Sequence, residues 1–178
     1  MKTKLLVLFV MLLPLGGCDW FKDLADITIN TELETDISVV ATGEKSADLI
    51  SGVNAANFSA FSILSLVDNP DLEEYVDKIK DIDLTGLVIT VNGLPAGYTI
   101  TTLTLDVTGV GVLCTQTNIT SANSSFTPVV NTEKLAQAAA KLKSDKEITC
   151  TVYGSISGPL AWIVTLSFDA KVVASPLD

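Results

Sequence analysis

The sequence predicts a mainly β protein, a two-sheet antiparallel β-sandwich of the Ig-like or Greek-key type with two short helices. Two observations predict it. Most segments alternate apolar and polar residues with a period of two, and turn-forming residues interrupt these runs at strand-like spacing. Threonine, valine and isoleucine, which favour strands, are abundant. A partly open barrel is the alternative architecture for the same pattern.

The first strands are expected near Ile27–Leu33, Ile37–Ala41 and Phe58–Val67. In the next strand, residues 82–84 fall out of phase with the apolar alternation of residues 87–91, and Gly86 lies at the break. A β-bulge at this glycine would return both halves to one face.

Three later runs each have one apolar and one polar face. Their apolar residues are Leu103, Leu105 and Val107, then Ile148, Cys150, Val152 and Ile156, and finally Trp162, Val164, Leu166, Phe168, Ala170 and Val172. Turns are expected between the runs, where the sequence has Asn92-Gly93, Gly109 with Gly111, and Ser157-Gly158-Pro159.

Two short helices are expected among these strands. Asn69, Pro70 and Asp71 have the order of a cap, a first-turn proline and an acid at the positive end of the helix dipole. The second helix is expected over Thr132–Lys143, where apolar residues recur at helical spacing. These residues are Leu135, Ala138, Ala139 and Leu142.

The N-terminus has the features of an export signal. Two lysines precede the apolar run Leu5–Leu15, which is shorter than the ~20 residues that a membrane-spanning helix needs. The following Leu15-Gly16-Gly17-Cys18 resembles the lipobox of bacterial lipoproteins, which implies cleavage before Cys18 and acylation of its thiol. An ordinary secretory signal with an incidental Cys18 is the alternative.

This resemblance implies three regions. Residues 1–17 are expected to form the signal peptide, residues 18–26 the lipidated N-terminus and tether, and residues 27–178 a single sandwich domain. Several acyl chains on one cysteine bind a membrane more strongly than a single chain does. The expected location is therefore the bacterial cell envelope, with the outer membrane favoured over the inner.

Composition excludes several functions. The chain has a net charge of −10, so nucleic acid is not an expected partner. It has no histidine, which excludes Ser-His-Asp and Cys-His sites and removes the commonest zinc ligand. Paired carboxylates remain possible, but the acids cluster on turns and on the first expected helix. No catalytic residue, metal site or cofactor is expected.

Two sets of residues are candidates for chemistry or binding. Cys114 and Cys150 are both expected to point inward and could form a disulfide if their strands face one another; two separate buried thiols are the alternative. Tyr153 and Thr151 share the polar side of one strand, and Tyr98 flanks a turn. Exposed tyrosines beside hydroxyls could form a platform for a glycan.

A second resemblance covers most of the chain after Cys18. The segment from Asp68-Asn69-Pro70-Asp71 to the strand at residues 87–91, and the closing segment 165–177, are similar to motifs of small, uncharacterised lipid-anchored β-sandwich proteins of Gram-negative envelopes. This resemblance offers no catalytic residues, and together with the missing histidine and the expected anchor we expect a non-enzymatic interaction or structural module near a membrane. Its partner would be another envelope protein, with a surface carbohydrate as the alternative.

Overall fold

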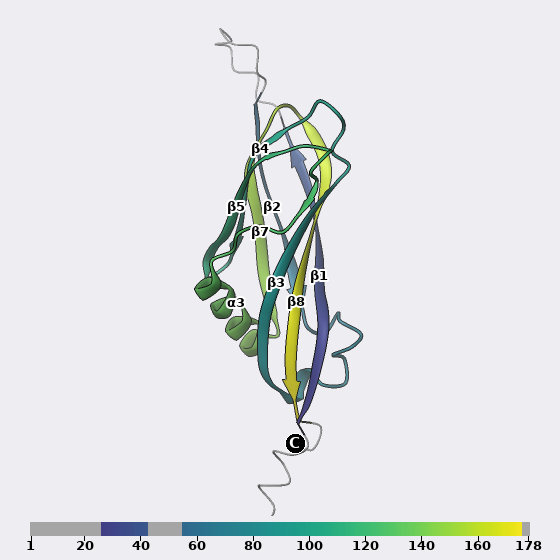
Figure 1. Ribbon diagram of the computed structural model, residues 1–178, viewed down its shortest axis with the longest axis vertical. Helices are drawn as coiled ribbons and strands as arrows, with labels where there is room; N and C mark the ends of the chain where they lie inside the picture. The colour runs from purple at the N-terminus through teal and green to yellow at the C-terminus, as the bar shows by residue number, and fades with distance from the viewer. Residues whose placement is uncertain (1–25, 43–54, 176–178) are drawn as a thin grey trace, which may run out of the picture.

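The computed structural model describes residues 26–42 and 55–175, which form two four-stranded antiparallel sheets (Figure 1). The strands are β1 (Ile27–Ala41), β2 (Ala56–Ser65), β3 (Ile79–Asn92), β4 (Ile100–Val107), β5 (Gly111–Ile119), β6 (Ser125–Phe126), β7 (Glu147–Ile156) and β8 (Leu160–Ala174). A 3-10 turn, η1 (Val76–Lys78), precedes β3, and helix α3 (Thr132–Asp145) precedes β7. The prediction of a mainly β, sandwich-like fold is confirmed.

Sheet A has the strand order β1-β8-β3-β6, with the 15-residue strand β8 between its two long neighbours. The register places Leu33, Phe168 and Leu87 in one row across β1, β8 and β3. All three side chains are buried. The apolar alternation that predicted β8 therefore faces the core along the whole strand.

Strand β1 is continuous, whereas the sequence predicted two strands separated near residue 35. Thr35 occupies an inward position that the alternation pattern assigns to an apolar residue. Its hydroxyl donates to the Ile63 carbonyl oxygen of β2 (3.1 Å) and lies 2.9 Å from Ser62 Oγ. Because this polar group is bonded inside the sandwich, the strand continues through it. The same contacts hold β1 and β2 side by side at one edge.

Sheet B has the strand order β2-β7-β4-β5. The residues predicted to face inward from β4 and β7 are buried. Between the sheets, the rings of Phe58 on β2 and Trp162 on β8 meet edge to face with centroids 4.9 Å apart. The core therefore lies between the two sheets, as a sandwich requires.

The bulge predicted at Gly86 is confirmed. The register between β3 and β8 shifts between Leu84 and Gly86, and both Leu84 and Leu87 are buried. The extra residue returns the two halves of β3 to the same face. Three further shifts occur. One lies in β3 between Ile79 and Asp81, and two lie in β4, between Ile100 and Thr102 against β7 and between Leu105 and Asp106 against β5.

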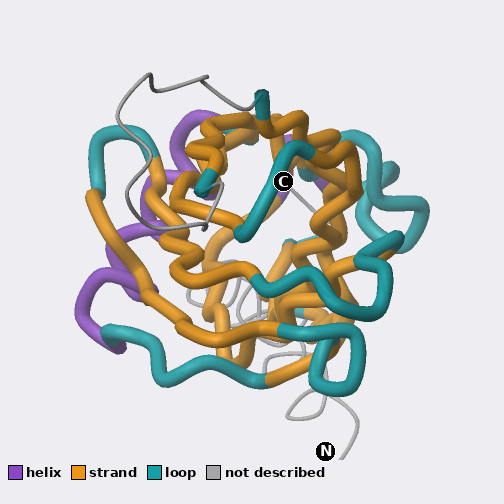
Figure 2. The backbone as a smooth tube through the Cα atoms, turned by 90° about the horizontal axis from the view of Figure 1, so that it is seen from above, coloured by secondary structure: helices purple, strands orange, loops and turns teal. Residues whose placement is uncertain are grey.

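Helix α3 confirms the second predicted helix and extends it by two residues, to Asp145. Its N-terminus is capped by Asn131, whose Oδ1 accepts from the Lys134 amide (3.1 Å). Its C-terminus is closed by Lys146 in the left-handed conformation. The predicted apolar stripe is buried and packs against β3 and β7. Figure 2, viewed from above, shows the helix along one side of the strands.

The first predicted helix is wrong. The segment after Asn69 forms successive turns in which amides bond three residues back: Leu72 to Asn69, Tyr75 to Leu72, and Lys78 to Tyr75. The Asn69 side chain accepts from the Asp71 amide as a cap does, but its Nδ2 also donates to the Glu32 carbonyl oxygen of β1 (2.8 Å). This tertiary contact, together with the complete burial of Leu72, holds the segment as a tight connection between β2 and β3.

Both ends of the described domain lie at the same end of the sandwich. Ile27, at the start of β1, pairs with Ala174, at the end of β8. Turn η1 is also at this end, where the Ser175 amide donates to the Lys78 carbonyl oxygen (3.0 Å). Figure 1 shows this end at the bottom of the view, and we call it the terminal end.

Candidate functional site

The structure places the predicted site residues in three different regions. Cys18 and the expected signal peptide lie outside the described residues. Of the expected tether, only Asp26 is described. Thr151 and Tyr153 lie together on the outward side of β7, as predicted. Tyr98 lies in the turn before β4.

Tyr98 does not belong to the predicted platform. It is partly buried and packs against the hydrophobic core. Tyr153 is paired with Thr104 of β4, and Tyr98 lies six residues before Thr104. Six residues of extended chain span about 20 Å, so Tyr98 lies far from Tyr153. The sequence could identify the turn but not which strand pairs with β7, so the distance between the two tyrosines was not predictable.

The outward side chains of sheet B form the surface that we call the sheet B face. Its central row crosses all four strands in the order Phe61, Thr151, Asp106 and Val112. The next row has the order Ser59, Tyr153, Thr104 and Thr115. The remaining outward residues are Asn57, Ile63, Ser65, Thr102, Thr117, Glu147, Thr149 and Ser155.

Apolar and aromatic side chains are exposed on the sheet B face. The exposed fraction is 69% for Phe61, 49% for Ile63, 39% for Tyr153 and 38% for Val112. Phe61 is diagonal to Tyr153 across the β2–β7 pair, a spacing that aromatic side chains can bridge. Sequence reasoning missed Phe61, although its spacing contained the signal. Phe58 and Phe61 are three residues apart in one strand, so they must point to opposite faces.

The two outer faces differ sharply in charge. Asp106 and Glu147 are the only charged residues of the sheet B face, and Glu147 lies at its end. Hydroxyl groups occupy most other positions, and the central Thr104 and Thr115 lie within hydrogen-bonding distance (3.1 Å). The outer face of sheet A instead has many acids, including Glu32, Glu34, Asp36, Asp83 and Asp169.

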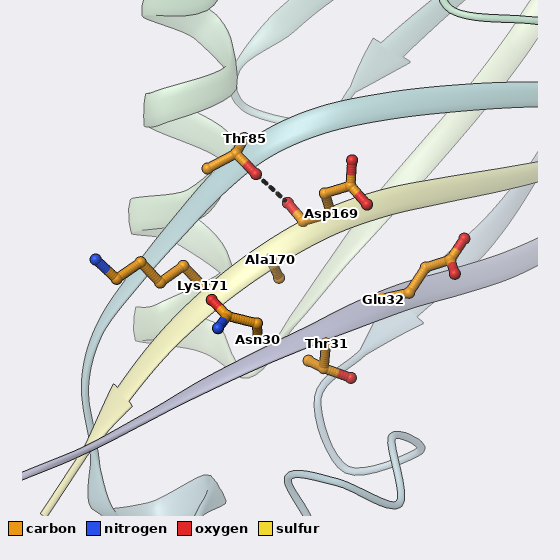
Figure 3. Close-up of a pocket in the computed structure, with 7 residues that line it drawn as sticks. All are labelled: Asn30, Thr31, Glu32, Thr85, Asp169, Ala170 and Lys171. Carbon is orange, nitrogen blue, oxygen red and sulfur yellow. Dashed lines mark hydrogen bonds between the residues drawn. The ribbon is translucent and has the colours of Figure 1, made fainter.

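A polar depression of about 420 Å³ lies on the outer face of sheet A (Figure 3). Glu32 and Asp169 are directly opposite each other across β1 and β8, and Figure 3 shows their carboxylates on the same side of the strands. The Ser167 hydroxyl donates to Glu32, and Thr85 donates to the Asp169 carbonyl oxygen (3.4 Å). All lining residues come from β1, β3 and β8 of one sheet, so the depression has no opposing wall to enclose a substrate.

A second depression, of about 450 Å³, lies between α3 and the first half of β3. Its floor includes Ile79 and Ile82, and small alanines of α3 form one side. Asp81 and Lys143 lie at its rim with their charged atoms 4.0 Å apart. It has no aromatic or hydroxyl platform, so it does not resemble the predicted ligand surface.

Cys114 and Cys150 are free, buried thiols, which is the second of the two expected arrangements, and the possible disulfide between them is not formed. Their strands do not face one another. Both belong to sheet B, with β4 between β5 and β7. Strands β5 and β7 are two strand spacings, about 10 Å, apart, and Cys114 is in register with Val152 rather than with Cys150, so their Cα atoms are farther apart than the 4.4–6.8 Å that a disulfide needs. Burial raises the pKa of Cys150 to about 12 and that of Cys114 to about 11.

These thiols should therefore resist alkylation in the folded protein. The thiolate is the reactive form, and at pH 8 both groups are neutral and shielded from reagent. We expect iodoacetamide to label neither residue in the native protein within the time that labels an exposed cysteine. Without reductant, both should be labelled fully after denaturation, as read by peptide mass mapping. A denatured, unreduced chain that protects both cysteines would contradict this prediction.

Within residues 26–42 and 55–175, no helix combines the length and apolar character needed to cross a bilayer. The same residues contain no group of three or more cysteine, aspartate or glutamate side chains placed to hold a metal ion. Comparisons of the chain with known protein families, with curated proteins and with solved structures found no match. The sheet B face is therefore the candidate functional site on its geometry alone.

Proposed function

We propose that this protein is a non-enzymatic, lipid-anchored module of the bacterial cell envelope, and that the sheet B face is the surface through which it contacts its partner. Lipid on Cys18 would hold it to the membrane, with the outer membrane favoured over the inner. The single observation that supports the contact surface is the exposure of Phe61, Ile63, Tyr153 and Val112 on one nearly uncharged face. Exposed apolar patches with polar surroundings are typical of interaction sites.

The position of the terminal end supports the anchoring geometry. The expected tether, residues 18–26, leads directly into β1 at that end. Strand β1 has 15 residues, which gives the sandwich a length of roughly 50 Å. An anchor at Cys18 would direct the opposite end away from the bilayer. The sheet B face would then stand along the side of the molecule, open to lateral contacts. An Ig-like or Greek-key classification of the sandwich stays a prediction.

The anchor is tested by substituting the acylated residue. Cys18→Ser removes the only thiol available for lipid at the mature N-terminus, so we expect the protein to move from the membrane fraction to the soluble fraction. Cys114→Ser serves as the control because this buried thiol has no role in anchoring, and membrane retention should be unchanged. Fractionation with immunoblotting and metabolic labelling with a palmitate analogue give the two readouts. Full membrane retention of Cys18→Ser would reject the anchor.

A carbohydrate partner is the alternative for the same surface. Tyr153 lies beside Thr104 and Ser59, and this combination of a ring and hydroxyls favours contact with a sugar. Neither of the two depressions described above lies on the sheet B face, however, and Ile63 and Val112 add aliphatic surface. Binding of purified envelope polysaccharide that is lost in Tyr153→Ala would favour this alternative over a protein partner.

A further inference from the structure

We infer that the partner of the sheet B face is a second copy of the same chain, packed sheet to sheet about a two-fold axis parallel to the strands. This inference rests on the proposed membrane anchor, because the anchor determines the direction of the axis. It names both the partner and the residue pairs that meet in the dimer.

The distribution of charge favours contact between two copies through the sheet B face. The chain carries a net charge of −10, so two copies repel one another at most orientations. Packing one outer face of sheet A on another would bring the acids of β1 and β8 together. The sheet B face has Asp106 as the only charge in its central rows. It is the sheet surface on which two copies can approach without opposing acidic clusters.

The composition and the area of the sheet B face are both compatible with a dimer interface. Threonine, valine, isoleucine and aromatic side chains on a flat sheet are the composition of an interface between packed sheets. Four strands of about nine residues cover roughly 600 Å². Two copies would therefore bury about 1,200 Å² in total, which reaches the lower limit of standard stable interfaces. Confinement to one membrane would raise the effective concentration and favour association further.

The proposed anchor restricts the symmetry of the dimer. Two copies anchored in one membrane must have their terminal ends at the same side. For two sheets packed face to face, only a two-fold axis along the strands keeps these ends together. This axis places β2 of one copy over β5 of the other, and β7 of one copy over β4 of the other.

The central row then pairs in a defined way. Phe61 of one copy meets Val112 of the other, so that an exposed ring covers an exposed aliphatic side chain. Thr151 meets Asp106, and its hydroxyl can donate to the carboxylate. Each contact occurs twice because of the symmetry. Phe61, the most exposed aromatic residue of the described part of the chain, and Asp106, the only charge of the central row, therefore both find complementary partners.

Crosslinking tests the residue pairs. Full-length chains carrying Phe61→Cys and Val112→Cys are co-expressed, and membranes are treated with a short bis-maleimide reagent. Facing sheets lie ~10 Å apart, which is too far for a direct disulfide but within reach of the reagent. We expect a crosslinked dimer from the mixed pair. Each variant alone should give little, because equivalent residues lie on opposite edges. Strong Phe61→Cys homodimers with no mixed product would overturn the proposed axis.

Association is tested by a matched pair of charge variants. Phe61 and Val40 are both exposed, at 69% and 62%, but on the outer faces of different sheets. The wild-type chain in mild detergent should have twice the monomer mass by light scattering. Phe61→Glu should be monomeric, and Val40→Glu should remain dimeric. A monomeric wild type without the mixed crosslink, or a crosslink from Phe61→Cys to a different protein or a glycan, would overturn the inference.

The amount of protein in the membrane fraction is measured in the same preparations. This measurement distinguishes failure of the membrane anchor from failure of the self-association. A protein that dimerises but is absent from membranes would reject the anchor and retain the sheet B contact. A membrane-bound monomer would retain the anchor and reject the self-association.

Discussion

Gly154→Ala is expected to cause a large loss of stability. A Cβ atom at this position would overlap the Thr102 carbonyl oxygen of the neighbouring strand and would lie 3.1 Å from Phe58 Cζ. Because β7 and β4 are the two central strands of sheet B, neither backbone can move without breaking the ladder. We expect a loss of about 3 kcal/mol or more, at the upper end for overpacked sites. Chemical denaturation followed by circular dichroism would measure it.

Gly86→Ala is the matched control for this substitution. Gly86 also lies in a strand beside a register shift, but a Cβ atom there would meet only the side chain of Asp169, most closely its carboxylate. That side chain is exposed and can rotate away, so we expect a loss of less than about 1 kcal/mol. Equal destabilisation by the two alanines would show that the approach of β4 to β7 is not the cause.

Phe168→Ala is expected to give the other large loss of stability. Phe168 is completely buried on the central strand of sheet A, between Leu33 and Leu87 of the flanking strands. Removing its ring would leave a cavity between the sheets, which costs about 3–5 kcal/mol for phenylalanine in a core. The free energy of unfolding in urea is the appropriate measurement.

Val173→Ala provides the comparison on the same strand. Val173 is partly exposed on the outer side of β8, so its truncation should change the free energy of unfolding by less than about 1 kcal/mol. If Phe168→Ala cost no more than Val173→Ala, the ring would not be filling the space between the sheets. Phe168→Leu should recover part of the loss, because it keeps most of the apolar volume.

Local patterns in the sequence were sufficient for the parts of the fold that depend on near neighbours. Alternation identified the buried faces of β4, β7 and β8, and the phase break identified the bulge at Gly86. Helical spacing identified α3. Each of these signals spans a few residues and reports a local geometry, namely the two-residue period of a strand or the 3.6-residue period of a helix.

The errors occurred where distant segments decide the local outcome. The segment after Asn69 has the residues of a helix start. Hydrogen bonds from Asn69 to β1 and from the Ser175 amide to Lys78 hold it as turns instead. Thr35 interrupts the apolar pattern, but its bonds to β2 keep β1 continuous. In both cases a long-range hydrogen bond replaces the local preference.

Residue patterns alone were enough to assign most of the core-facing residues, to locate the bulge in β3 and to exclude histidine chemistry. The order of the strands, on which the candidate site depends, emerged only from the folded chain. It separates Cys114 from Cys150 by β4, removes Tyr98 from the platform, and brings Phe61 into one row with Val112. The physical reason is that alternation fixes the side of a sheet on which a residue lies, whereas strand order is set by packing the whole core.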